Sequence, residues 1–160
     1  MTALRLGRLD VQLAPPRVVF AGRIDDSVAL GELVPQVPPG DVVLDTGAVT
    51  FVNSIGMREW MRFVRALRER GSLVTLERVA DVLMTQINLI PELARNVTVA
   101  SFHAQYLCSR CGGETAPLVD AIAHASDLRE LRAPKLPCPE CDGTRELADF
   151  PERYLSIFRK

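Results

Sequence analysis

Two Cys-x-x-Cys pairs constrain this chain more than any other feature. The first pair is Cys108 and Cys111, the second is Cys138 and Cys141, and the sequence contains no other cysteine. Two residues between cysteines let a tight turn direct both thiolates at one ion, and two such turns complete a tetrahedral shell around Zn²⁺. We therefore predict that these four cysteines bind one Zn²⁺ ion, within a zinc-ribbon module over residues 105–160.

The alternative for the cysteines is a pair of redox dithiols or disulfides, but neither pair lies in a thioredoxin-like βαβ pattern. Glycines follow both pairs, at Gly112 and Gly143 among others, where a turn needs positive φ or a close approach of backbone to sulfur. The 26 residues between the pairs exceed the usual spacing, and we expect a helix over residues 117–131 there. Four thiolates leave no open position for water, so the metal is expected to hold structure rather than to catalyse.

Charge is balanced along the chain, and this excludes several function classes. Residues 1–100 hold 11 Lys/Arg and 11 Asp/Glu, and residues 101–160 hold 8 and 9. Neither segment is basic enough to form a general phosphate-binding surface, which argues against nucleic acid as a partner.

The first residues form no apolar leader, and no run of apolar residues approaches the length of a membrane span. We expect a cytoplasmic protein, since reduced thiolates suit that compartment. Arg outnumbers Lys 17 to 2, as in a GC-rich bacterial genome.

Residues 1–104 are predicted to form one α/β domain with a mixed sheet covered by helices. Alternating apolar residues at 4–13 indicate one edge strand with an irregularity near Gly7, and the continuous apolar run at 41–45 is typical of a buried central strand. A loop is expected over residues 46–53. Further strands are predicted at 17–25, 72–77 and 96–104.

The longest predicted helix begins at Ser54 and ends at Gly71. Its apolar residues recur at helical spacing, and arginines fall on the opposite side. The apolar stripe of the long helix is Met57, Trp60, Met61, Val64 and Leu67, facing away from Arg58, Arg62, Arg65 and Glu69.

Further helices are predicted on either side of the long helix. Ser27 is expected to cap a short helix that Pro35 stops, and two more helices are predicted at 79–89 and 147–158.

Three short motifs in residues 5–105 together resemble the STAS domain of bacterial anti-sigma-factor antagonists. They are Phe20-Ala-Gly22-Arg-Ile24-Asp25, then Val42-Val-Leu-Asp45-Thr-Gly-Ala-Val49, then Phe51-Val-Asn-Ser54-Ile-Gly56-Met57. Their order and spacing carry the resemblance. It implies a non-enzymatic signalling module that binds a protein partner, an anti-sigma-like serine kinase, which phosphorylates a hydroxyl at the start of the long helix and is then released.

Carried onto this sequence, the resemblance makes Ser54 the phosphorylation candidate. It makes the partner-binding candidates Asp25, Asn53, Ser54, Gly56 and Met57. Asn53 stands where the family has Asp, and Ile55 offers no second hydroxyl. The alternative for Ser54 is a plain helix cap. The alternative function is a structural scaffold that self-associates or joins a larger complex without phosphorylation. No constellation of catalytic residues is present, so no enzyme activity is expected.

Overall fold

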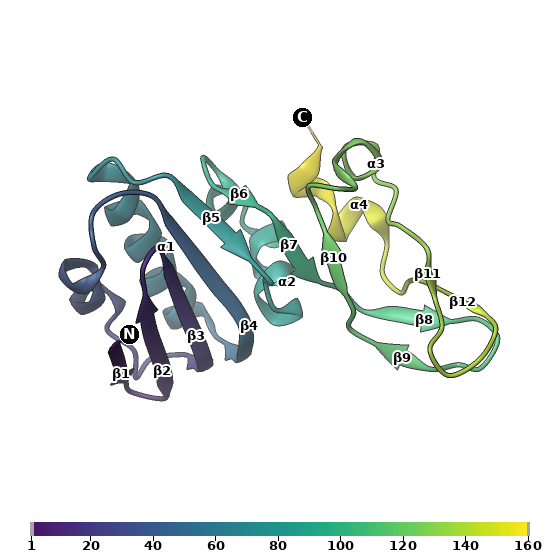
Figure 1. The fold of residues 1–160 in the computed structure, drawn as a ribbon, viewed down its shortest axis with the longest axis horizontal. Coiled ribbons are helices and arrows are strands. Elements are labelled where there is room, and N and C mark those ends of the chain that lie inside the picture. The colour runs from purple at the N-terminus through teal and green to yellow at the C-terminus, as the bar shows by residue number, and fades with distance from the viewer. Residues whose placement is uncertain (1, 160) are drawn as a thin grey trace.

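The computed structural model describes residues 2–159, which form a six-stranded mixed sheet beside a smaller part that carries the cysteines (Figure 1). The strands of the large sheet lie in chain order. The first three are antiparallel, and the third to sixth are parallel to their neighbours. The predicted mixed α/β class is confirmed. The strands are β1 Thr2–Leu6, β2 Leu9–Ala14, β3 Arg17–Ile24, β4 Val42–Val52, β5 Val74–Glu77 and β6 Thr98–Val99.

The first two strands form a hairpin, so the prediction of a single strand over residues 4–13 was wrong. The chain reverses at Gly7, whose φ of 58° is readily adopted only without a Cβ. Leu6 then pairs with Leu9 and Leu4 with Val11. Apolar and polar residues alternate in both β1 and β2, so the sequence was interpreted as one strand with an irregularity near Gly7.

Strand β4 is longer than predicted, because residues 46–52 continue it instead of forming a loop. Its pairing with β3 shifts register twice, between Val19 and Ala21 and between Gly22 and Arg23. Each bulge adds a residue to β4 and reverses the side to which the following side chains point. The regular alternation of a strand is therefore missing from this segment of sequence.

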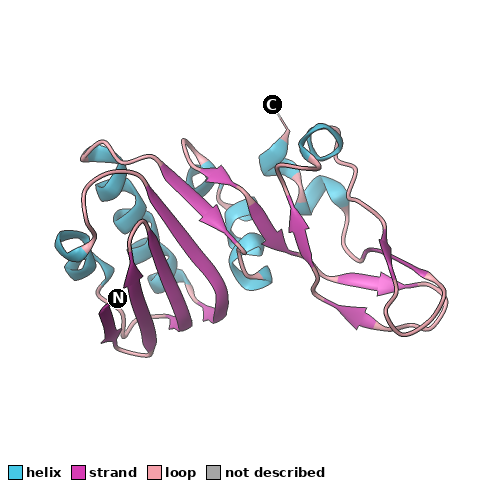
Figure 2. Cartoon of the chain, in the orientation of Figure 1, coloured by secondary structure: helices cyan, strands magenta, loops and turns pink. Residues whose placement is uncertain are grey.

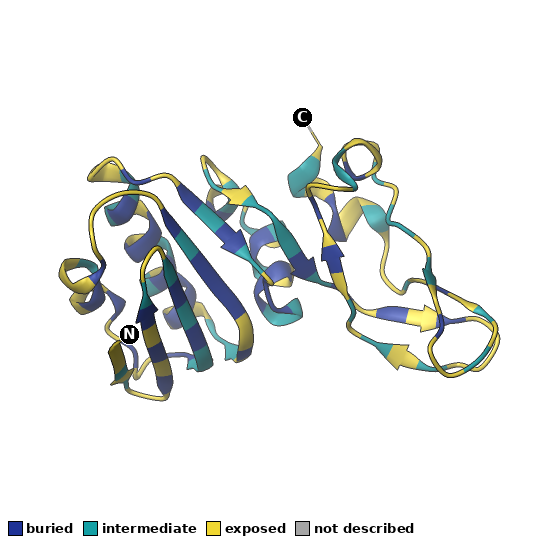
Figure 3. Ribbon diagram, in the orientation of Figure 1, coloured by how far each residue is buried: buried dark blue, intermediate teal, exposed yellow. Residues whose placement is uncertain are grey.

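Helix α1 (Ser54–Glu69) matches the predicted long helix and lies behind the sheet in the view of Figure 2. Its buried face packs on β3, where the ring of Phe20 lies 5.4 Å from Trp60 and 6.0 Å from Phe63, centroid to centroid. Phe63 is buried, whereas Met61 is only half-buried. Figure 3 shows the buried residues concentrated along the central strands and the facing side of this helix.

Two shorter helical segments flank α1. Helix α2 (Asp81–Leu89) confirms the helix expected over residues 79–89. The segment after Ser27 is a 3-10 helix, η1 (Leu30–Gln36), that contains Pro35 instead of stopping there. Ser27 does not cap it. Its hydroxyl bonds to Asp25 instead, so the predicted cap was wrong.

The cysteine-bearing part consists of two small sheets and short helices. One sheet pairs β10 with β7, and the other has the order β11-β12-β8-β9. The predicted strand over residues 96–104 is split into β6 and β7. The remaining elements are η2 Pro91–Ala94, β7 Ser101–His103, β8 Tyr106–Cys108, β9 Glu114–Thr115, β10 Leu118–Asp120, α3 Ala125–Arg129, β11 Leu136–Pro137, β12 Thr144–Leu147, α4 Pro151–Tyr154 and η3 Ser156–Phe158.

The helix predicted over residues 117–131 is reduced to the single turn-and-a-half of α3. The first part of that segment is β10, in which Val119 pairs with Phe102 of β7. Asp120 ends the strand, because its Oδ1 accepts the N–H groups of Ile122 and Ala123. Pairing with a distant strand has overridden the local helical pattern.

The C-terminal segment folds back onto the junction between the two parts. Tyr154 donates its hydroxyl hydrogen to Asp81 Oδ1 at 2.6 Å, and the carbonyl oxygen of His103 lies 2.8 Å away. The ring of Phe158 lies 5.3 Å from that of Phe102. The segment predicted as one helix over residues 147–158 thus holds the last residue of β12, then α4 and η3. Tyr154 and Phe158 cover α2 and β7, whereas Phe150 is exposed.

Candidate functional site

The four cysteines lie on two turns with the same backbone closure. Cys108 ends β8, and its N–H donates to Gly113 O at 3.0 Å. Cys138 follows β11, and its N–H donates to Gly143 O, also at 3.0 Å. Because β12 pairs with β8, the two turns are held against each other.

The four Sγ atoms lie within 4.8 Å of one another. Cys108 and Cys141 are separated by 3.5 Å between sulfurs, Cys111 and Cys138 by 3.7 Å, and all four are free thiols. Four sulfurs placed about 2.3 Å from a tetrahedral Zn²⁺ ion lie about 3.8 Å apart. The predicted clustering is confirmed, and its dimensions fit a metal ion with four thiolate ligands.

Gly143 allows this close approach. A Cβ there would lie 2.9 Å from Cys108 Sγ and 3.2 Å from Cys141 Sγ. The Gly143 N–H also donates to Cys141 Sγ at 3.2 Å. The sequence prediction of close approach between backbone and sulfur is therefore confirmed at this glycine.

Two of the cysteines, Cys138 and Cys141, have thiol pKa values shifted in opposite directions. The Glu140 N–H, with a smaller contribution from the Arg145 guanidinium, lowers the pKa of Cys138 to about 6 despite burial. The Gly143 N–H lowers the pKa of Cys141, but burial and the neighbouring thiolates outweigh it and raise that pKa to about 12. A divalent ion bound among the sulfurs would offset the negative charge of thiolates held this close together.

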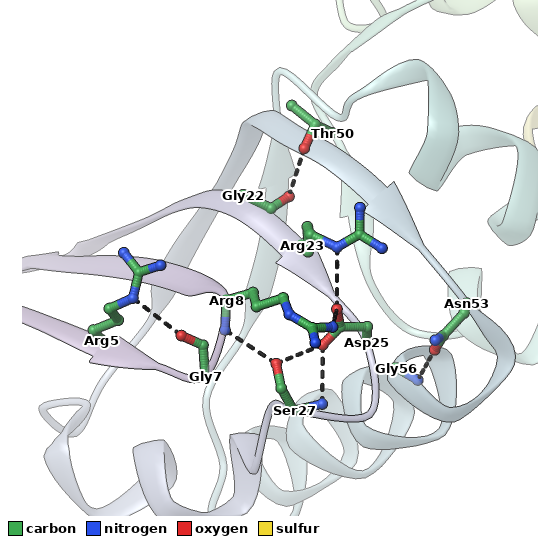
Figure 4. A network of polar contacts seen from close by, with 10 residues as sticks. All are labelled: Arg5, Gly7, Arg8, Gly22, Arg23, Asp25, Ser27, Thr50, Asn53 and Gly56. Atoms are coloured by element: carbon green, nitrogen blue, oxygen red, sulfur yellow. Dashed lines mark hydrogen bonds and ion pairs between the residues drawn. The ribbon is translucent and has the colours of Figure 1, made fainter.

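A second candidate site lies where β4 ends and α1 begins. Asn53, not Ser54, caps the helix, since its side-chain oxygen accepts the Gly56 N–H at 2.8 Å (Figure 4). The capping role considered for Ser54 therefore belongs to Asn53. Ser54 is the first residue of the helix and is exposed, as is Ile55.

Gly56 and Met57 lie in the interior. A Cβ on Gly56 would lie 1.9 Å from Ile24 O, so the helix end touches the end of β3 directly. Met57 is 2% exposed and packs in the core. These two residues position the start of α1 and do not present side chains to the surface.

Asp25 is buried at the end of β3 and holds the loop that follows. It accepts hydrogen bonds from the hydroxyl and N–H of Ser27, from Arg8 and from Arg23 (Figure 4). The Ser27 bonds, with help from the two guanidinium groups, hold the pKa of the Asp25 carboxyl far below its usual range. Asp25 thus anchors the loop beside α1 rather than facing outward.

Asp45 of β4 has partners different from those of Asp25. Arg78 Nε donates to its carboxylate at 2.9 Å and the Gly47 N–H donates at 3.1 Å. Each aspartate is thus paired with an arginine and with a nearby backbone N–H, as expected for structural acids.

Two residues with prominent contacts were not identified from the sequence. The Arg23 guanidinium lies 3.8 Å above the ring of Phe51, beside the start of α1. Arg145 of β12 is buried next to the cysteines. A single arginine in a short strand carries no signal in sequence, because its surroundings come from distant segments.

None of the helices in residues 2–159 combines the length and apolar character needed to cross a membrane. Comparison with protein-family models, with curated proteins and with solved structures gave no match for this chain.

Proposed function

We propose that this chain is a non-enzymatic protein-binding module of the STAS type, whose docking surface is controlled by phosphorylation of Ser54. The surface consists of residues 51–55 together with Arg23, Arg58 and Arg62, and is called the helix-end surface below. The observation that carries the proposal is the division of roles at the start of α1. Asn53 caps the helix, which leaves the hydroxyl of Ser54 exposed and outside the cap.

The chemistry of the helix-end surface suits a partner with apolar and acidic groups. Ile55 is 51% exposed, which is unusual for its type. Arg58 and Arg62 are exposed one and two turns after Ser54, on the same side of the helix. A partner of this chemistry would be a regulatory protein, and a serine kinase of the anti-sigma type fits the proposal.

A phosphate on Ser54 would weaken such docking without unfolding the helix. It adds about two negative charges in the first turn of α1, where the helix dipole favours them. The same charges would offset the arginines that attract an acidic partner and would place a strongly hydrated group beside Ile55. The expected result is release of the partner.

The test compares the full chain with S54A and S54D in capture of proteins from its native cell. S126D is the matched control, because Ser126 is exposed at α3 in the other part of the molecule. A serine kinase retained by wild type, S54A and S126D, but held roughly tenfold less well by S54D (1.4 kcal/mol), would support the proposal. Phosphate on Ser54 in the native protein is also expected.

The second candidate is a structural scaffold without phosphorylation, and the identity of residue 53 favours it. Asn53 uses its amide oxygen in the cap and places no carboxylate near Ser54. Equal binding by wild type, S54A and S54D, no phosphate on Ser54, and self-association in analytical ultracentrifugation would establish the scaffold and exclude the switch.

For the metal, we propose Zn²⁺ bound by Cys108, Cys111, Cys138 and Cys141 in a structural site, in a chain that works in the reducing cytoplasm. Bound there, the ion would join the two turns and leave no position for substrate. Metal analysis of the purified protein should find one zinc per chain. Visible absorption from iron bound to the thiolates, or two disulfides by mass spectrometry, would contradict this assignment.

A further inference from the structure

Arg145 is a buried charge without a charged partner. Its side chain is 3% exposed, and among residues 2–159 no carboxylate forms an ion pair with it. Nη1 donates to Thr115 Oγ1, whereas Nε and Nη2 are buried without a partner. Burying an uncompensated guanidinium is costly, so its position calls for a negative group that the side chains alone do not provide.

The buried aspartates show that this situation is not general in the molecule. Asp25 and Asp45 are each 1% exposed, and each has an arginine within 3.2 Å. Both arginines keep about half of their surface in solvent. Arg145 differs from these pairs, because here the buried group is the cation and no carboxylate pairs with it in the described residues.

The unpartnered end of Arg145 faces the cysteine cluster. Arg145 lies directly across from Cys108 in the β12–β8 register. A Cβ on Gly113 would lie 3.4 Å from Arg145 Nη2 and 3.3 Å from Cys111 Sγ, so this nitrogen and this sulfur flank the same glycine. Glu140 Oε2 also lies 3.4 Å from that point, but Glu140 is exposed and makes no ion pair with Arg145 in the described residues.

Four thiolates around one divalent ion carry a net charge of about −2. A cation fixed beside them in a water-poor interior offsets part of this charge, and free N–H groups can donate to sulfur. We propose that Arg145 is the built-in counter-ion of the metal–tetrathiolate cluster, a positioning residue that stabilises the metal-bound state. This inference rests on the proposed metal site.

The experiment titrates the reduced full chain with Co²⁺, whose absorption reports tetrahedral thiolate binding, in competition with a chelator. It compares wild type, R145K, R145M and the control R110M, which removes a charge at an exposed position in the first cysteine turn. R145M should bind Co²⁺ about 10–100-fold more weakly. R145K should stay within a few-fold of wild type, because it keeps the charge, and R110M should match wild type.

The contrast between R145K and R145M separates charge from packing. R145M binding like wild type, or R145K losing as much affinity as R145M, would overturn the counter-ion role while leaving the metal site in place. Wild type failing to take up Co²⁺ would overturn both. If R145M does not fold with metal present, R145K decides, with wild-type affinity supporting the role and a large loss overturning it.

Discussion

At the start of α1, some residues hold the end of the helix in place and others face solvent. Asn53 accepts the Gly56 N–H, Gly56 allows contact with Ile24, and Asp25 holds the loop that follows β3. Ser54 is the member of this group left at the surface. The sequence motif therefore contains mostly structural residues around one exposed hydroxyl.

The cap can be tested by substitution. N53A removes the acceptor of the Gly56 N–H and should lower the free energy of unfolding by about 1 kcal/mol. S54A should change it by much less, because its hydroxyl lies outside the cap. Urea unfolding of both variants measures this difference. A larger loss of unfolding free energy for S54A than for N53A would show that Ser54, not Asn53, caps the helix.

Asp25 should make stability depend on pH. Its pKa is lowered in the folded state by the Ser27 hydrogen bonds and then by Arg8 and Arg23. A lowered folded-state pKa contributes stability above the unfolded value of about 3.9, and this contribution is lost as pH falls below it. D25N should therefore be less stable than wild type at pH 7, and the gap should narrow below about pH 4.

The matched control for D25N is D10N. Asp10 also pairs with an arginine, Arg5, but both side chains are mostly exposed. Exposed pairs contribute little, so D10N should follow wild type across the pH series of thermal melts. A gap between D25N and wild type that stays constant from pH 7 to pH 3 would contradict the role of the Asp25 charge.

Elements with a long repeating pattern in their own sequence could be predicted, whereas elements determined by pairing with other strands could not. The stripe from Met57 to Leu67 identified α1, and the spacing of the cysteines identified their cluster. The bulges in β4 and the pairing of Val119 with Phe102 depend on neighbouring strands, so the local sequence suggested a loop and a helix instead. Arg145 was missed for the same reason.

The contrast between the buried central strand β4 and the exposed side of α1 gives a direct test of the fold. Leu44 is completely buried in the central strand, so L44A should cost about 2–5 kcal/mol of unfolding free energy. R65A alters an exposed position on α1 and should cost less than about 0.5 kcal/mol. Circular-dichroism melts that show the reverse order would contradict this arrangement of sheet and helix.

Over the whole molecule, the two parts obtain their stability differently. The large sheet and its helices share an extensive apolar core, whereas the cysteine turns bury few apolar side chains of their own, chiefly Tyr106. Turns with so little core of their own depend on a metal ion or another cross-link. Removal of the metal should therefore destabilise the cysteine turns and leave the large sheet unaffected.

Hydrogen exchange with and without a zinc chelator measures this difference in the full chain. Chelation should speed exchange in β8, β9, β11 and β12, and leave β3, β4 and β5 protected. Uniform loss of protection would mean that the metal supports the whole fold. Unchanged protection in the cysteine turns would mean that they hold together without metal.

The bond from Tyr154 to Asp81 spans 73 residues, and it has a consequence for how the protein is made. Chains leave the ribosome from their N-terminus, and early domains fold first. The sheet and the long helix precede both cysteine turns in the chain, so they can assemble first. Tyr154 follows the second turn closely and can reach α2 only when the chain is nearly complete. The junction is therefore expected to close last, against a sheet that has already formed.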